Sequence, residues 1–294
     1  MSLRVFALPV LFMVFTPRPA GAQEQLRWNL RPNETLRYSV VQNMKSTTKF
    51  GDEEVNSSFQ QTIDMSWHVL SAAANGDTIL NQVFDRVRLQ MAGGPAGTIE
   101  FDTASQTTQD NPVLKALSDV FGNIVGQQFK VIMKQTGQIE DVIVPEKLAE
   151  AVRQSAAGQQ GALTDKMLKD MMKQSAVMLP AQPVGPGSQW TSEQTVQMPF
   201  GTMTITSAMK FVQKDTEGNA IIDFVPTVRI TPREGAQTSM TLDGSEGRGR
   251  VNFDISRGRV NQTQLDLKLQ MTMTVNGQKL PQTVHNVTSM TLIP

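Results

Sequence analysis

The sequence lacks the residue types on which most metal and redox sites depend. It has 294 residues, with no cysteine and only two histidines, His68 and His285. The absence of cysteine excludes disulfides, thiolate zinc sites, iron–sulfur clusters and cysteine nucleophiles. It also excludes the lipid-bearing cysteine of exported bacterial lipoproteins. Two histidines far apart in the chain do not make a histidine-rich site, so we expect neither a metal ion nor a cofactor.

Charge is also scarce. Charged residues make up 18% of the chain, below the value of about 25% that is typical of globular proteins. Basic and acidic residues balance at 27 each, whereas a nucleic-acid-binding domain usually carries a basic face. We therefore expect no nucleic-acid partner. A hydrophobic content of 39% in a chain of this length is sufficient for a large folded core.

The sequence also has no clear catalytic motif. There is no Gly-x-Ser-x-Gly nucleophile elbow, and His68 falls in the polar phase of an alternating segment. The carboxylates at 52–54 belong to a turn, and aromatic residues, 6% in all, are too few to frame a sugar site. The glycines Gly244, Gly247 and Gly249 lack the Gly-Lys-Ser/Thr ending of a phosphate-binding loop, and we interpret them as a turn. We expect a protein that is not an enzyme.

Residues 1–22 have the pattern of a cleaved secretory signal peptide. Arg4 provides a positive start, an apolar run follows over 5–15, and an Ala-x-Ala cleavage pattern stands at 20–22. The run is too short to span a bilayer, and no later segment reaches that length. A cysteine-free chain needs no oxidising environment to fold, which favours a bacterial envelope. We expect an exported protein, periplasmic or extracellular, with no transmembrane segment in the mature chain.

The chain contains one β-rich pattern twice. Two alternating apolar runs are each followed, after the same interval, by a glycine, Gly76 in the first half and Gly218 in the second. The next segments match with a difference of one residue, which a β-bulge would absorb. The matched segments are 63–69 with 205–211, 79–89 with 221–230, and 131–139 with 251–260. These matches predict an internal duplication.

The period of these segments is two, which predicts strands. Residues 265–275 are apolar at every second position, as in a strand with one buried and one wet face, a mark of antiparallel sheets. Tight-turn signals at Asn75-Gly76 and Asn276-Gly277 indicate hairpin connections. About a dozen such strands would curl. The predicted fold class is mainly β (α+β): a duplicated antiparallel meander forming a curled sheet or open barrel, with an inserted helical segment.

Three stretches, at 111–121, 145–153 and 164–173, have helical spacing instead. The first has Asn111 as its N-cap and Pro112 at the first helical position. A Pro/Gly-rich run then interrupts both helix and strand. The predicted domains are a signal peptide at 1–22, a first β module at 23–144 with a short helix near 111–122, a helical insert with a Pro/Gly linker at 145–188, and a second β module at 189–294.

Methionine is unusually abundant, at 17 residues. Thioether sulfurs bind copper(I), but Met271 and Met273 continue the apolar face of a predicted strand, so we interpret them as core. Methionine also lines adaptable binding surfaces. The helix at 164–173 would close over the concave face of the sheet as a lid and hold an acyl chain or apolar peptide; packing of a core helix explains the same residues. The candidate lid residues are Met167, Leu168, Met171 and Met172.

Two segments resemble a family of exported bacterial proteins of unknown function. The run from Pro183 to Trp190 is similar to the Pro-Val-x-x-Gly-Asp-x-Trp boundary of that family, with Ser188 in place of Asp. The stretch from Asn33 to Tyr38 is similar to its Gly-Glu/Asp…Tyr start, with Asn in place of Gly. The resemblance implies secretion and a duplicated β-rich fold, and it implies no catalytic residues. The chain is also similar, at the level of fold alone, to periplasmic lipoprotein carriers, whose curled sheet holds acyl chains under helical lids.

These features predict a non-catalytic extracytoplasmic binding protein for a lipid, a lipoprotein or an apolar peptide. The alternative is an envelope structural or assembly protein that binds a protein partner through its strand edges. A binding protein needs an enclosed apolar cavity, whereas a scaffold needs an exposed strand edge and a filled core.

Overall fold

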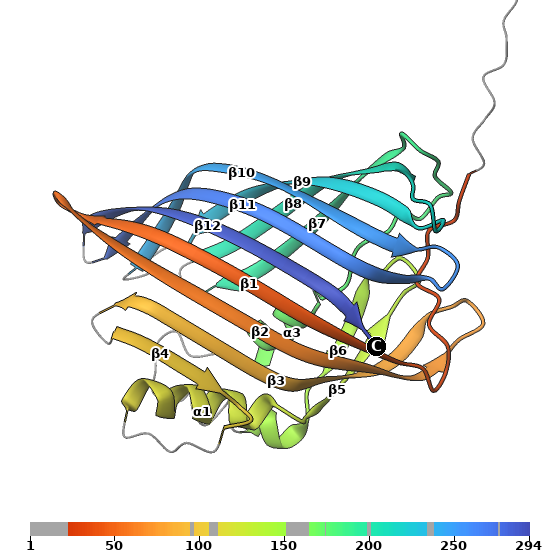
Figure 1. The fold of residues 1–294 in the computed structure, drawn as a ribbon, viewed down its shortest axis with the longest axis horizontal. Coiled ribbons are helices and arrows are strands. Elements are labelled where there is room, and N and C mark those ends of the chain that lie inside the picture. Colours follow the sequence, from red (N-terminus) through yellow and green to blue (C-terminus); the bar gives the residue numbers. More distant parts are fainter. Residues whose placement is uncertain are drawn as a thin grey trace, which may run out of the picture.

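A twelve-stranded antiparallel sheet dominates the described part of the chain (Figure 1). The computed structural model describes residues 23–94, 97–105, 111–150, 165–173, 175–198, 201–233, 238–275 and 277–294, without the side chains of residues 94, 165, 167 and 171. The predicted signal peptide at 1–22 lies outside the described residues. No helix in the described ranges is both long enough and apolar enough to cross a membrane.

The strands follow one another mostly through short hairpins. In the first half they are β1 (Thr35–Phe50), β2 (Glu53–Ala72), β3 (Thr78–Gly94), β4 (Gly97–Asp102), β5 (Gln128–Met133) and β6 (Ile139–Ile143). In the second half they are β7 (Gln189–Met198), β8 (Gly201–Lys214), β9 (Ala220–Pro232), β10 (Thr238–Asp254), β11 (Arg259–Val275) and β12 (Gln278–Ile293).

Two helices lie in the segments that join these strands, α1 (Pro112–Ile124) and α3 (Asp165–Met172). The predicted start of α1 is confirmed, because the Asn111 side chain accepts a hydrogen bond of 2.9 Å from the Val113 amide, with Pro112 in the first turn. Residues 146–150 are also helical, within the second predicted helix. Residues 151–153 of the predicted helix lie outside the described residues.

The strand order is β6-β5-β3-β2-β1-β12-β11-β10-β9-β8-β7, with β4 beside β3. The sheet curls but does not close, since β6 and β7 remain its two ends, and α3 packs against both of them. The predicted fold class is therefore confirmed. One local interpretation was wrong: Gly244, Gly247 and Gly249 form no turn but lie within β10. The alternating residues between them complete the strand pattern, and β11 pairs along the whole run.

The two faces of the sheet differ in chemistry. Leu265 and Leu267 on β11 share the face that also carries Val40 and Met290, which we call the inner face. The opposite, outer face is polar and carries ion pairs that are partly or largely exposed. These are Arg88–Asp64 at 2.6 Å, Arg250–Asp223 at 2.6 Å and His285–Asp266 at 2.8 Å. Alternation along each strand produces this separation, since successive side chains point to opposite faces.

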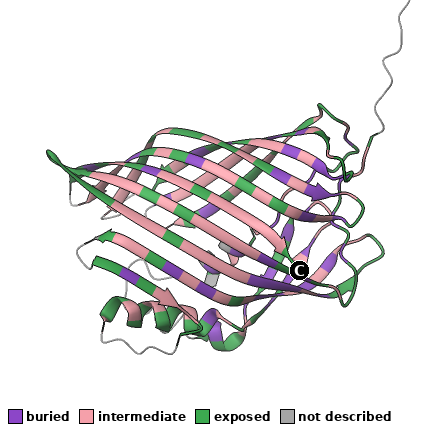
Figure 2. Ribbon diagram, viewed as in Figure 1, coloured by how far each residue is buried: buried purple, intermediate pink, exposed green. Residues whose placement is uncertain are grey.

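The main core fills one end of the inner face. Figure 2 shows the buried residues gathered toward the end of the sheet where the chain terminates. At this end Trp28, from the segment before β1, packs against Trp67 with ring centroids 5.6 Å apart. Tyr38 and Phe253 complete the aromatic cluster. All four side chains are almost fully buried, so they anchor this end of the sheet.

The pairing of the strands repeats between the two halves of the chain. β1, β2, β3, β5 and β6 lie side by side in the same succession as β7, β8, β9, β10 and β11, and β12 joins the two sets. The equivalent pairs are Val69–Leu80 and Leu80–Val131 in the first set and Phe211–Ile222 and Ile222–Val251 in the second. These are the positions that the internal sequence match aligns.

The irregularities of the two sets also correspond. The register shifts after Val69 in β2 and after Phe211 in β8, at equivalent positions. β3 has a further shift opposite Asp64 and Met65, where Asp85 has no partner, and β9 has none there. This unpaired residue is the one-residue difference between the two sequence segments. The predicted β-bulge is therefore present.

Candidate functional site

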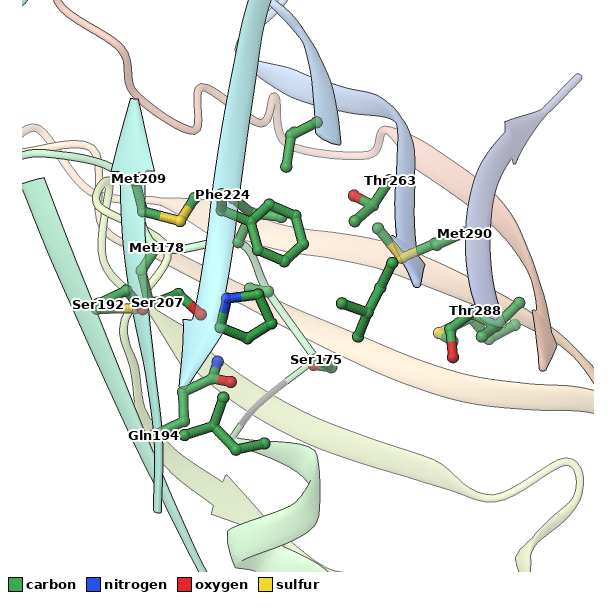
Figure 3. Close-up of a pocket in the computed structure, with 18 residues that line it drawn as sticks. Ser175, Met178, Ser192, Gln194, Ser207, Met209, Phe224, Thr263, Thr288 and Met290 are labelled. Atoms are coloured by element: carbon green, nitrogen blue, oxygen red, sulfur yellow. The ribbon is translucent and has the colours of Figure 1, made fainter. Parts of the chain in front are cut away.

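A cavity of about 380 Å³ lies between the inner face of the sheet and residues 175–178 (Figure 3). It is next to the main core on the inner face, and most of its wall is apolar. The lining residues come from β1, β2 and β7–β12 and from 175–178: Val40, Met65, Ser175, Ala176, Val177, Met178, Ser192, Gln194, Ile205, Ser207, Met209, Phe224, Pro226, Val251, Thr263, Leu265, Thr288 and Met290. A volume of this size is within the range of about 300–1,000 Å³ that is usual for ligand pockets.

Two glycines of β10 shape one wall. A Cβ on Gly249 would lie 2.0 Å from the ring of Phe224, and a Cβ on Gly247 would lie 2.7 Å from the ring of Pro226. Both rings belong to β9, the neighbouring strand. Because glycine has no side chain, the two rings lie close against β10 and the cavity stays open in front of them.

The opposite wall is an irregular segment, residues 175–179, which we call the strap. Its backbone is held from several sides. The indole N–H of Trp28 donates to the Val177 carbonyl at 3.0 Å, and that of Trp190 donates to the Met178 carbonyl at 3.2 Å. The Leu179 amide donates to the Thr136 carbonyl at 2.8 Å. The strap is thus fixed across the inner face without belonging to a helix or a strand.

The four predicted lid residues belong to α3, immediately before the strap. Leu168 and Met172 are 6% and 4% exposed and are part of the main core. The side chains of Met167 and Met171 lie outside the described residues. Of the two with described side chains, neither Leu168 nor Met172 is among the described residues that line the cavity. Whether the helix also opens as a lid stays a prediction.

Tyr38 is a buried titratable group within the aromatic cluster. Its hydroxyl donates to the carbonyl of Val260 at 3.1 Å. Val260 lies on β11, which is separated from β1 by β12. Burial raises the pKa of this phenol well above its usual range. Tyr38 is therefore neutral at physiological pH, and its hydroxyl serves the fold.

A second hollow, of about 660 Å³, is polar and lies beside the loops that follow β8 and β10. Its carboxylates are already engaged by their own turns. The Glu217 carboxylate accepts a hydrogen bond from the Asn219 side chain at 3.4 Å, and the Asp254 carboxylate accepts one from the Ser256 hydroxyl at 2.7 Å. No group of three or more histidine, aspartate or glutamate residues in the described ranges is arranged to hold a metal ion. The apolar cavity is therefore the stronger candidate.

The chain matches the model of DUF6263, described as a family of unknown function, over residues 75–279. The chain belongs to this family. The match includes β3 to β11, and so most of the sheet and most of the cavity wall. It confirms the resemblance to a family of unknown function. No curated protein matches this DUF6263 chain.

Three solved structures are similar to this DUF6263 chain in part. A lipovitellin structure concerned with lipid–protein interactions is 12% identical with a TM-score of 0.46; the match covers 90% of this chain but only 25% of the lipovitellin chain. A DUF1329 family protein from Desulfovibrio piger is 8% identical over 85% and 83% of the two chains, with a TM-score of 0.15. A putative AttH from Nitrosomonas europaea is 10% identical over 98% of each chain, with a TM-score of 0.15. At these scores the likenesses carry no argument about function.

Sequence reasoning missed the strap and most of the cavity wall. Met178 was not among the candidate lid residues, but it lies beyond α3 and lines the cavity. Ser192, Ser207 and Thr263 were not singled out, although they occupy inner positions of strands that were predicted. The sequence did contain a signal for the cavity. Each of these small polar residues occupies an inner position on a face that is otherwise apolar.

Proposed function

We propose that this DUF6263 chain is a non-catalytic, extracytoplasmic binding protein that holds an apolar ligand against the inner face of its sheet. The observation that carries the proposal is the cavity of about 380 Å³ between the sheet and the strap. Close packing is the rule in protein interiors. A space of this size, lined mainly by methionine, aliphatic and aromatic side chains, is therefore suited to an acyl chain or a comparable apolar group.

The strap supports the same proposal. It covers the cavity with four consecutive lining residues, 175–178, and its backbone is held by Trp28, Trp190 and Thr136. These three hydrogen bonds hold consecutive residues of the strap, Val177 to Leu179, in place over the cavity. This anchoring supports a cavity that is part of the fold.

An extracytoplasmic location is part of the proposal. It is supported by the signal-peptide pattern of residues 1–22 and by the absence of cysteine from the whole chain. Expression of the precursor in a bacterial envelope, followed by mass measurement of the purified protein, tests it. We expect a mass that corresponds to a chain beginning at Gln23. An unprocessed chain in the cytoplasm would contradict the export proposal and leave the cavity proposal standing.

The ligand proposal is tested by extracting the protein purified from that envelope and identifying bound small molecules by mass spectrometry. We expect an apolar compound in a fixed ratio to protein. A matched pair of variants then locates it. Ser207→Phe places a ring in the cavity, whereas Ala208→Phe, the next residue on β8, places the same ring on the outer face.

Ser207→Phe is expected to abolish co-purification of the ligand, and Ala208→Phe to leave it unchanged. Both variants are checked for an unaltered β signal by circular dichroism. The proposal is contradicted if the two variants retain the ligand equally, or if neither they nor the unmodified protein ever bind an apolar compound.

Binding of a protein partner through strand edges has less support. β6 and β7 are the two ends of the sheet, and Ile143 on β6 is 48% exposed. However, α3 packs against both of these strands, as is common where a protein covers its sheet edges. The filled core that a scaffold needs is also interrupted by the cavity. We therefore place the strand-edge role second.

A further inference from the structure

The cavity wall carries polar groups but no charge. None of its described lining residues is acidic or basic. The polar ones offer hydroxyl and amide groups only: Ser175, Ser192, Gln194, Ser207, Thr263 and Thr288. Such groups donate and accept hydrogen bonds without requiring a charged partner. They are spread among four strands and the strap, so a bound molecule would meet at least one of them in most orientations.

Thr263 stands out among these groups. Its hydroxyl is buried and has no hydrogen-bond partner among the described residues. Thr263 lies on β11 between Val251 of β10 and Met290 of β12, both apolar. Figure 3 shows its hydroxyl on the side that faces Phe224. Leaving a buried hydroxyl unpaired is costly, so this position has hydrogen-bonding capacity that a ligand in the cavity would satisfy.

A polar pair continues from the cavity on the same face. Thr288 on β12 accepts a hydrogen bond of 3.2 Å from the Asn286 side chain, and Asn286 in turn accepts one of 3.0 Å from Gln42 on β1. This network is also uncharged. The hydroxyl of Thr288 is therefore already oriented by its neighbours, whereas that of Thr263 is not.

The cations close to these strands are directed elsewhere. Arg250 on β10 pairs with Asp223 on the outer face. Arg259, at the start of β11, donates to Glu34 at 2.8 Å beside the core. A carboxylate placed in the cavity would lose its hydration without gaining a cationic partner, and an unpaired buried charge is strongly unfavourable.

Given the proposed function, on which this inference rests, we propose that the cavity selects an apolar ligand with an uncharged hydrogen-bonding head, such as a hydroxyl, ester or amide, over a long-chain carboxylate. Thr263 is the principal group that recognises this head. A neutral head forms a hydrogen bond with the Thr263 hydroxyl and leaves no buried charge. An ionised fatty acid of the same chain length forms the hydrogen bond only at the cost of burying its charge.

The test compares 1-dodecanol with dodecanoate, two ligands with the same chain length and different heads. The mature protein is freed of bound lipid and loaded with the neutral fluorescent dye Nile red, and each ligand is titrated in at pH 8. We expect dodecanol to displace the dye at a concentration at least about tenfold lower than dodecanoate, which corresponds to about 1.4 kcal/mol. Equal or tighter binding of dodecanoate would overturn the inference while leaving the proposed function intact. Failure of Nile red and both ligands to bind would overturn both.

Thr263→Val tests the residue itself, because valine has nearly the same shape and lacks the hydroxyl. We expect the affinity for dodecanol to fall about three- to tenfold and the affinity for Nile red to stay the same. Thr206→Val, on the outer face of β8, is the matched control and should change neither affinity. The thermal midpoint of Thr263→Val should equal or exceed that of the unmodified protein, since an unpaired hydroxyl is removed. Unchanged dodecanol affinity in Thr263→Val would refute the role of this residue.

Discussion

The two halves of the chain build the same strand pattern and use its inner face differently. In the first half, Met65 and Trp67 of β2 reach into or beside the aromatic core. In the second half, the equivalent positions of β8 are Ser207 and Met209, and both line the cavity. Equivalent backbone positions therefore carry a large side chain in one half and a smaller one in the other. The duplication explains the common strand pattern, and the size of a few inner side chains determines which part of the inner face is packed and which part lines the cavity.

The remaining cavity wall follows the same division. Among the described lining residues, only Val40 and Met65 come from the first half of the sheet, while β7 to β12 and the strap provide the others. The first half also holds the insertions β4 and α1, which have no equivalents among the described elements of the second half. Both copies contribute to the main core, the second through Phe211, Ile222 and Phe253, but most of the described cavity wall belongs to the second copy. Mutations at equivalent positions of the two copies test this difference between them directly.

The largest effect is expected from single-residue deletions at equivalent strands. Deleting Thr227, which pairs regularly with Thr206, would turn the following inner residues of β9 to the outer face. Deleting Asp85, the unpaired residue of the β3 bulge, would instead restore the pattern of the second copy. We expect the first deletion to prevent folding.

The Asp85 deletion should cost only about 1–2 kcal/mol, because the 2.6 Å hydrogen bond from Ser66 is lost. Circular dichroism and urea unfolding of the two proteins measure the difference. If the Asp85 deletion fails to fold as well, the bulge is essential in the first copy, and the two copies are less alike than their pairing suggests.

The next effect concerns the core of the first copy. Trp67→Met places the residue of the second copy at the equivalent position, where Trp67 is 1% exposed and contacts Trp28 and Tyr38. We expect a loss of about 2–4 kcal/mol in the free energy of unfolding, because a large aromatic side chain is replaced by a smaller one. Met209→Leu, a change of similar volume beside the cavity, should cost less than about 1.5 kcal/mol. Similar losses in the two variants would show that the first copy is no more tightly packed than the second.

Local patterns allowed much of this fold to be predicted. Alternation identified the strands, the Asn111-Pro112 pair located the start of α1, and the one-residue difference between the copies located a bulge. Each of these features depends on residues within a few positions of one another. The interpretation of Gly244, Gly247 and Gly249 as a turn was wrong because glycines are common in turns. In β10 the same glycines instead accommodate Phe224 and Pro226 from the neighbouring strand.

The cavity could not be predicted because its determinants are distant in the sequence. Its walls depend on the junction of β1 with β12, strands that are joined by no hairpin and whose register has no local signal. The strap has neither helical nor strand periodicity, and it is positioned by two tryptophans, Trp28 and Trp190, from opposite sides of it in the sequence. The predicted lid residues belong to α3, immediately before the strap, and their role as a lid stays a prediction; the strap itself was not singled out from the sequence.

The smallest effect is expected from an ion pair that only the first copy has. Arg86 follows the bulge of β3 and pairs with Asp102 on the inserted strand β4 at 2.5 Å. The hydrogen bond from Arg86 lowers the pKa of Asp102 to about 2. Since this pKa is lower in the folded chain than the ordinary value of 3.8, the ionised carboxylate contributes stability at neutral pH, and the contribution is lost as the pH falls from about 4 to about 2.

Asp102→Asn should therefore lower the urea midpoint slightly at pH 7 and leave it equal to that of the unmodified protein near pH 2. Arg86→Gln should give the same small loss at pH 7, and the double variant should lose no more than either single variant. Both side chains are partly exposed, which keeps the effect small. The outer-face pair Arg250–Asp223 offers the equivalent test in the second copy, because the hydrogen bond from Arg250 lowers the pKa of Asp223. A larger loss from Asp223→Asn than from Asp102→Asn would mean that the second copy depends on its surface for stability that the first copy obtains from its core.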